Sequence, residues 1–140
     1  MIVMTLGTFD LFHTGHVELL RRCKQLSGGS DVVVGLNTDG FVERYKGRPP
    51  VIGYADREAV LRACRFVDRV VPNDQPGGSA ADAVLGARAR VIAVGSDWQG
   101  RDYLGQLGVS AEWLEARGVS VVYLARTPGI SSSQIREALR

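Results

Sequence analysis

The sequence predicts an α/β protein built on a parallel sheet of about five strands, with helices on both faces. Two observations lead to this fold class. Short runs rich in β-branched residues alternate with segments whose apolar residues recur at helical spacing, and the alternation continues to the end of the chain. The length of 140 residues suits a single domain, residues 1–140, with a substantial core. The pattern is that of a Rossmann-like, doubly wound fold, in which ligands bind beyond the carboxyl ends of the strands.

The first half of the chain begins this alternation. Glycine and serine at 28–30 form a stop signal after the first helical pattern, and the polar residues 37–40 end the second apolar run. The expected elements are a strand at Ile2–Leu6, a helix with inward residues Val17, Leu20, Cys23 and Leu26, and a strand at Val32–Leu36.

The segment Phe41–Tyr54 has no clean period, and we expect a long loop with no more than one helical turn. It is interrupted at Gly47, Pro49, Pro50 and Gly53. Long loops in small domains are usually functional, so the basic residues of this segment form a candidate anion-binding group. These residues are Arg44, Lys46 and Arg48, and solvated surface charge is the alternative interpretation.

The second half repeats the pattern. The expected helices cover Asp56–Arg65 and Ser79–Ala89, with a short helix from Ser110 and a last one from Ser131. The expected strands are Val70–Val71, Val91–Val94 and Val119–Leu124. Ser79 with Asp82 is read as a capping box. Because Cys23 and Cys64 fall at apolar helical positions, free thiols are expected rather than a disulfide or a metal pair.

Composition excludes several classes of protein. The net charge of +2 is too small for a nucleic-acid-binding protein, so an anion site must be local. A hydrophobic fraction of 45% and a charged fraction of 23% are ordinary for a folded soluble domain. With no secretory signal and no apolar run long enough to span a membrane, the sequence predicts a cytoplasmic protein that binds neither membrane nor nucleic acid.

Three unusual segments follow predicted strands and therefore share one edge of the predicted sheet. They are GTFDLFHTGH (Gly7–His16), GSDWQG (Gly95–Gly100) and RTPGISSS (Arg126–Ser133). The first contains both histidines of the chain. A glycine-containing turn at the head of a helix suits a phosphate, and a histidine can donate a hydrogen bond to it. Zinc is disfavoured because no third histidine exists. The alternative to a phosphate contact is that either histidine is a buried core residue.

Other phosphate and nucleophile motifs are missing from the sequence. There is no GxxxxGK[ST] loop, no GxGxxG after the first strand and no GxSxG elbow. The serines at 131–133 have no spare histidine to activate them, so we interpret them as helix-cap and phosphate-contact groups.

The HxGH element at His13–His16, paired with RTPGIS after the last strand, resembles the HxGH nucleotidyltransferases. The chain is most similar to glycerol-3-phosphate cytidylyltransferases, and the similarity extends through YADRE, RFVDRVVP and DWQG. The resemblance implies that a phosphate oxygen of the acceptor attacks the α-phosphorus of a nucleoside triphosphate. Pyrophosphate leaves and no covalent enzyme intermediate forms, so catalysis is placement and charge neutralisation.

The resemblance also implies roles for individual residues. The catalytic residues that neutralise the transferring phosphoryl group would be His13, His16, Lys46 and Arg126. Nucleotide contacts are expected from Gly7, Thr8, Phe9, Asp10, Gly15, Asp97, Trp98, Thr127, Gly129, Ile130, Ser131 and Ser132. Acceptor binding is expected from Arg57 and Arg65. Three alternatives stay open: Asp10 as a turn-forming residue, Trp98 as core filler and Arg65 as a structural residue.

The same resemblance implies Mg²⁺ as cofactor, held by phosphates and water rather than by protein ligands, and a homodimer. CTP and a small alcohol phosphate such as glycerol 3-phosphate are the favoured substrates. ATP with FMN, a sugar phosphate or another phosphorylated precursor is the alternative, because Ser96 and the long segment Asp102–Gly118 depart from the pattern. A nucleotide-binding module without turnover is a third hypothesis, disfavoured because groups aimed at the transferring phosphate are kept.

Overall fold

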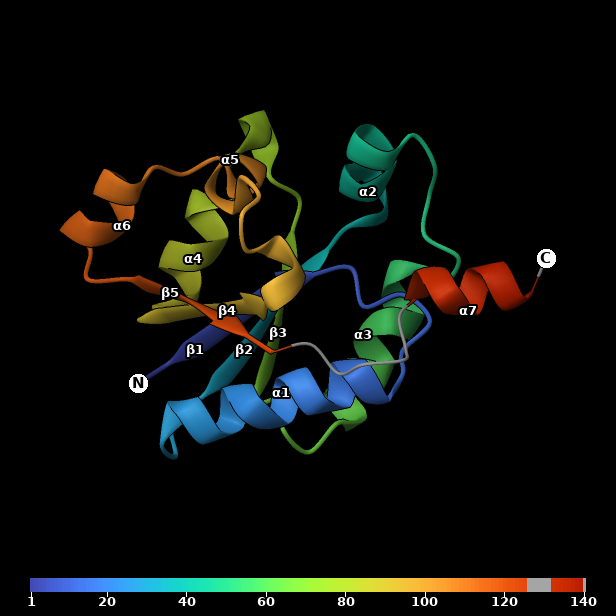
Figure 1. Cartoon of the computed structure of the whole chain (residues 1–140), viewed down its shortest axis with the longest axis horizontal. Helices are drawn as coiled ribbons and strands as arrows, with labels where there is room; N and C mark the ends of the chain where they lie inside the picture. Colours follow the sequence, from blue (N-terminus) through green and yellow to red (C-terminus); the bar gives the residue numbers. More distant parts are fainter. Residues whose placement is uncertain (126–131, 140) are drawn as a thin grey trace.

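The computed structural model describes residues 1–125 and 132–139, and its strands form one parallel sheet in the order β3-β2-β1-β4-β5 (Figure 1). The strands are β1 (Val3–Gly7), β2 (Val32–Asn37), β3 (Arg69–Asn73), β4 (Val91–Gly95) and β5 (Ser120–Leu124). Every strand pair is parallel, as expected for strands joined by helical crossovers. The predicted fold class is therefore confirmed.

The helices cover both faces of the sheet. They are α1 (Thr14–Ser27), α2 (Asp39–Lys46), α3 (Tyr54–Ala63), α4 (Ala81–Ala87), α5 (Tyr103–Leu107), α6 (Ala111–Ala116) and α7 (Ser132–Ala138), with short turns η1 (Pro76–Gly78) and η2 (Ser96–Trp98). Helices α1 and α3 pack on one face and α4 to α6 on the other (Figure 1). Among these described helices, none combines the length and apolar character needed to cross a membrane.

Side chains alternate between the two faces of the sheet along each strand, so each face has its own hydrophobic core. Val3 points toward α1 and Met4 toward α4, because successive side chains of a strand face opposite ways. The α4 side is filled by Met4, Ile92, Val84, Leu107 and Leu114, all nearly inaccessible to solvent. Cys23 lies in the core of the α1 side, and both cysteines are free, as the sequence predicted.

The strand order reverses between β1 and β4, which makes this pair the switch point of the sheet. The chain builds outward from β1 to β3, then returns to the other side of β1 to add β4 and β5. The loop before α1 and the turn η2 both leave the sheet at this point. In open α/β sheets this is the position of the ligand crevice.

The long loop predicted at Phe41–Tyr54 is wrong in its first half, because α2 ends only at Lys46. Thr38 caps this helix by accepting a hydrogen bond from the backbone N–H of Phe41. Phe41 and Val42 are its only buried residues, so a helix of two turns leaves no repeating apolar period to detect. Lys46 is thus the last residue of a helix rather than part of a long loop.

One further expectation needs correction, and one helix was not predicted. The capping box predicted at the start of α4 is not formed: the cap residue is Ala80, which has no side-chain cap, and Ser79 accepts from the N–H of Ala81 instead. The long segment Asp102–Gly118 contains an additional helix, α5, capped by Asp102 through the N–H of Gly105. This segment packs through Tyr103 and Leu107 onto the α4 side of the sheet.

We expect Gly108→Ala to destabilise the protein more than Gly28→Ala. Both glycines end helices at left-handed φ, +66° and +60°, which costs an L-residue about 1–2 kcal/mol. A Cβ at Gly108 would also overlap the Gly78 carbonyl oxygen, whereas one at Gly28 meets nothing within 4 Å. Urea unfolding should therefore show a loss of about 2–4 kcal/mol for Gly108→Ala, and equal losses would contradict tight packing of α5 against η1.

Candidate active site

The loop between β1 and α1 is held in a strained backbone conformation. Phe9 and Leu11 have φ of 51° and 49°, a left-handed region that residues other than glycine rarely adopt. Phe9 folds back into the core beneath Gly7, where a Cβ would lie 3.1 Å from its ring. Such strain persists only when surrounding contacts enforce it, and it is typical of functional sites.

His13 and His16 form a reciprocal cap at the start of α1. His13 Nδ1 accepts the Gly15 N–H at 3.0 Å, and His16 Nδ1 accepts the His13 N–H at 3.1 Å. The two rings are stacked with centroids 3.9 Å apart. Histidine here replaces both the serine and the glutamate of the usual capping box, so the HxGH spacing is also a helix start signal.

This cap fixes the tautomer of both rings. Because each Nδ1 accepts a backbone N–H, a neutral ring must carry its proton on Nε2, on the other side of the ring. The N–H groups of Gly15, His16 and Val17 already bond within the first turn. These three amides are therefore used within the helix start, and the Nε2–H of His16 is a side-chain donor of this turn. A contact of Gly15 with the nucleotide stays a prediction.

His16 is kept neutral by its surroundings. Its ring lies 5.3 Å from the rings of both Phe9 and Phe12. Burial, followed by the neighbouring His13, lowers the pKa of His16 from 6.5 to about 4. At neutral pH this histidine is a hydrogen-bond donor without a positive charge, and it cannot serve as an acid that releases a proton.

The low pKa of His16 predicts acid-sensitive stability. Between pH 6.5 and about 4 the unfolded chain protonates this histidine and the folded chain does not, so the free energy of unfolding falls as the pH falls. From pH 7 to pH 5 this contribution amounts to about 2 kcal/mol. His16→Gln, which keeps a cap acceptor, should lose that part of the pH dependence in urea titrations. An unchanged slope would contradict the depressed pKa.

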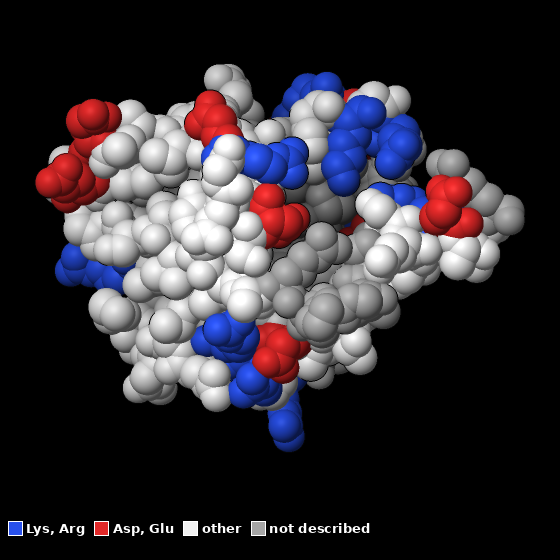
Figure 2. All heavy atoms as spheres, viewed as in Figure 1, with Lys and Arg blue, Asp and Glu red and all other residues white. Residues whose placement is uncertain are grey.

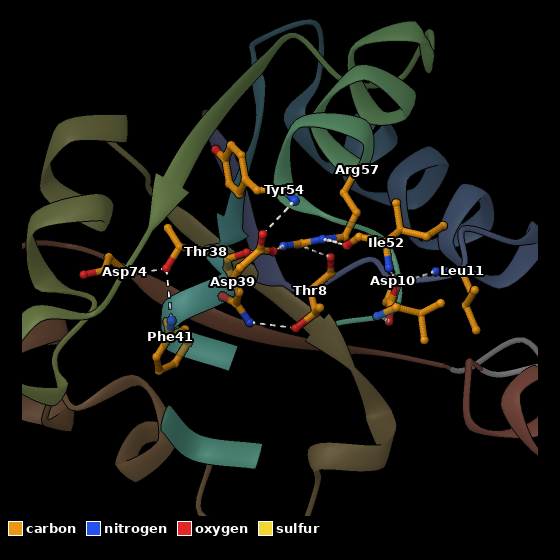
Figure 3. A network of polar contacts seen from close by, with 12 residues as sticks. Thr8, Asp10, Leu11, Thr38, Asp39, Phe41, Ile52, Tyr54, Arg57 and Asp74 are labelled. Carbon is orange, nitrogen blue, oxygen red and sulfur yellow. Dashed lines mark hydrogen bonds and ion pairs between the residues drawn. The ribbon is translucent and has the colours of Figure 1, made fainter. Parts of the chain in front are cut away.

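Arg57 joins the carboxyl ends of β1 and β2 to the segment before α3 (Figure 3). Its guanidinium donates to the carbonyls of Thr8, Asn37 and Ile52 at 2.8–2.9 Å and pairs with Asp39 at 2.6 Å. The Arg57 side chain is 1% exposed. Four of its five N–H donors are thus used inside the protein. This position argues against the acceptor contact expected from the sequence and indicates a positioning role.

Asp10 ties the same loop to the segment after α2 (Figure 3). Its carboxylate accepts the N–H groups of Leu11, Val51 and Ile52 at 2.8–3.1 Å, and the residue is 6% exposed. These bonds support the interpretation of Asp10 as a residue that fixes the turn. Its contact with the nucleotide stays a prediction.

We expect Arg57→Met to cost about 3 kcal/mol or more, because one buried and two partly buried carbonyls would lose their donor. The matched control is Arg62→Met on the outer face of α3, where an exposed pair with Glu58 is lost. That change should cost less than about 1 kcal/mol. Equal losses in chemical denaturation would mean that Arg57 does not hold the loops together.

A basic cavity of about 360 Å³ opens beside this loop. Three segments line it: the loop after β1, the end of α2 with the residues that follow, and α7. Lys46, Arg48 and Arg136 supply its positive charge and Asp10 its carboxylate. Figure 2 shows Lys and Arg gathered where α2 lies, next to a hollow in the surface. The expected anion-binding group is thus divided, because Arg44 instead pairs with Asp74 at 3.4 Å.

The structure brings some of the predicted residues together. Gly7 ends β1, the loop that follows contains Thr8, Phe9, Asp10 and His13, and Gly15 and His16 lie in the first turn of α1. Asp97 and Trp98 belong to η2 after the neighbouring strand β4. Trp98 packs partly on the core, 5.3 Å from the Tyr103 ring, and carries Arg101 over its face at 4.5 Å. Both parts thus leave the sheet at its switch point, and contacts to a nucleotide stay predictions.

Other predicted residues lie elsewhere. Arg65 is exposed, rests over the Phe66 ring at 4.9 Å and does not line the cavity, so its role in acceptor binding stays a prediction. Arg126, Thr127, Gly129, Ile130 and Ser131 lie outside the described residues, and Ser132 is the first residue of α7. Arg136 was missed by sequence reasoning, because nothing in the pattern separates it from an ordinary surface arginine near the end of a helix.

The fold and this arrangement define a class: an α/β protein with a candidate site for an anionic ligand beside the switch point of a parallel sheet. Residues 4–138 match the family model described as cytidylyltransferase-like, and the chain belongs to this family. It is therefore a nucleotidyltransferase.

Individual relatives agree with this assignment. The glycerol-3-phosphate cytidylyltransferase of Staphylococcus aureus (strain NCTC 8325 / PS 47) is 36% identical over 137 residues, covering 98% of this chain and 93% of that protein. An FAD synthase of Pyrococcus horikoshii is 41% identical over 91 residues, covering 65% of this chain and 60% of that protein. The lipopolysaccharide core biosynthesis protein of Thermoplasma volcanium GSS1 shares the fold, with a TM-score of 0.67, 23% identity and coverage of 91% of this chain and 98% of that chain.

Proposed function

We propose that this protein transfers CMP from CTP to glycerol 3-phosphate and releases pyrophosphate. The observation that carries the proposal is the pair of capped histidines, His13 and His16, which place Nε2–H donors at the switch point of the sheet. The name of the Staphylococcus aureus relative, which matches nearly the whole chain, supports the choice of substrates.

The proposed reaction is an in-line displacement. An oxygen of the acceptor phosphate forms a bond to the α-phosphorus while the bond from that phosphorus to the bridging oxygen breaks, and pyrophosphate leaves with the electron pair. The attacking phosphate needs no base. His16, which is neutral at pH 7, therefore acts by donating a hydrogen bond to developing negative charge, together with His13.

Further residues would complete the site. Lys46, at the end of α2, approaches the transferring phosphoryl group from the cavity side, and Arg126, Thr127, Ser131 and Ser132 receive the β- and γ-phosphates. Mg²⁺ would arrive with the triphosphate and offset part of its charge. Among the described residues no group of three or more His, Cys, Asp or Glu could hold a metal, so phosphates and water would be its ligands.

A second candidate is adenylyl transfer from ATP to FMN or another phosphorylated precursor, which the similarity to an FAD synthase favours. Thermal-shift titration separates the two nucleotides, because the ligand that binds the folded state raises its melting temperature. A larger shift with ATP than with CTP would favour this candidate. We also propose a homodimer, which light scattering coupled to gel filtration would test.

Pyrophosphate release tests the proposed function. With Mg²⁺, CTP and glycerol 3-phosphate, the wild-type protein should turn over, and His16→Gln should lower kcat by about 100-fold or more because one preorganised donor is lost. Arg21→Gln, at an exposed position on the same helix, is the matched control and should keep full activity. Turnover by His16→Gln at the wild-type rate would reject the role of His16, and absence of wild-type turnover would reject the proposed substrates.

A further inference from the structure

The basic cavity shares the loop after β1 with the histidine pair. Its lining includes Thr8, Asp10 and Leu11 from the loop after β1, but neither His13 nor His16. The opposite walls come from the end of α2 and from α7. Both helices lie outside the sheet. A ligand in this cavity would therefore contact the loop that carries the histidines through residues other than the histidines themselves.

The charges of the cavity fit one phosphate monoester. Lys46, Arg48 and Arg136 face a single carboxylate, Asp10, which leaves an excess of two positive charges. A phosphate monoester carries a charge between about −1.5 and −2 at pH 7. In the part of the chain that the structure describes, Lys46 and Arg48 form no ion pair with a carboxylate.

Arg136 keeps guanidinium N–H donors for a ligand, although the Asp10 carboxylate lies beside it. Its Nη1 is 3.9 Å from Asp10 Oδ2, beyond hydrogen-bond distance, so the pair orients the guanidinium without using a donor. Asp10 itself is already occupied by three backbone N–H groups. One Nη2–H of Arg136 reaches Ser133 at 3.3 Å, and the planar fork retains enough donors for a phosphate.

We propose that this cavity is the subsite for the phosphate of the acceptor, with Arg48 and Arg136 as its ligands. The inference rests on the proposed function in taking the acceptor to be a phosphate monoester. In-line displacement requires the attacking oxygen to approach from the side opposite the leaving pyrophosphate. Lys46 lines the same cavity as the two arginines, so a phosphate held by them would lie within the same group of cations as Lys46. Arg136 is thereby a specificity-determining residue of α7.

Steady-state kinetics of single variants test the subsite. Arg136→Gln and Arg48→Gln should each raise KM for glycerol 3-phosphate by about 10- to 100-fold, as expected for loss of a charged hydrogen bond. KM for CTP should change less than about 3-fold, because the histidine side of the site is untouched. Arg136→Lys should recover part of the loss, since it keeps the charge without the fork. Arg117→Gln, at the exposed C-terminal cap of α6, is the matched control and should behave as wild type.

Calorimetric titration of glycerol 3-phosphate without nucleotide separates this inference from the proposed function. If the wild-type protein turns over CTP and both glutamine variants keep its KM for the acceptor, the subsite is wrong and the function stands. If CTP is not used but binding of the phosphate ester is lost in both variants, the function is wrong and the subsite stands. A rise in KM for CTP alone would assign the arginines to the nucleotide and overturn the inference. Circular dichroism checks that each variant is folded. If Arg136→Gln does not fold, the KM of Arg48→Gln for the acceptor tests the subsite by itself.

Discussion

The hydrogen bonds of the Arg57 guanidinium are the interaction on which the rest of the site depends. Three carbonyls lie close together beyond the end of β1, at the end of β2 and before α3. The arginine bonds to these carbonyls of Thr8, Asn37 and Ile52, while Asp39 balances its charge. A buried cation is tolerated because its donors are satisfied. The loop that carries the histidines and the wall of the basic cavity are thereby fixed to one side chain.

The histidine pair combines a structural and a chemical role in the same atoms. Each Nδ1 is used to start α1, and this bond places the proton of each neutral ring on Nε2. Packing between Phe9 and Phe12 keeps His16 uncharged. Donors that need no proton transfer suit a reaction whose nucleophile is already an anionic phosphate oxygen. The cost is sensitivity to acid, because the folded state resists protonation that the unfolded state accepts.

The basic residues after β2 show how tertiary contacts divide similar side chains between structure and function. Arg44 is used to tie α2 to Asp74 beyond β3, whereas Lys46 and Arg48 line the cavity. Arg136 joins them from the far end of the sequence. Charge in this cavity is thus assembled from the end of α2, the segment after it and α7, while the histidine side follows directly on the end of β1. Under the proposed function, the histidine side would bind the nucleotide and the cavity would bind the acceptor.

The sequence by itself determined the alternation of strands and helices and the position of the histidines beyond the carboxyl end of the first strand, because these follow from local periodicity and from the geometry of parallel sheets. The short helices α2 and α5, and the reversal of strand order beside β1, came only from the structure. The sequence also indicated the anionic character of the ligand, through the glycine and histidine spacing of one turn. Only the tertiary structure decided that Arg57 is buried, that Arg44 is structural and that Arg136 reaches the cavity. The physical reason is that the sequence pattern does not distinguish an arginine that binds a ligand from one that stabilises the fold. Its role is set by which carbonyls, carboxylates or open space lie within reach of its guanidinium, and these come from segments far apart in the chain.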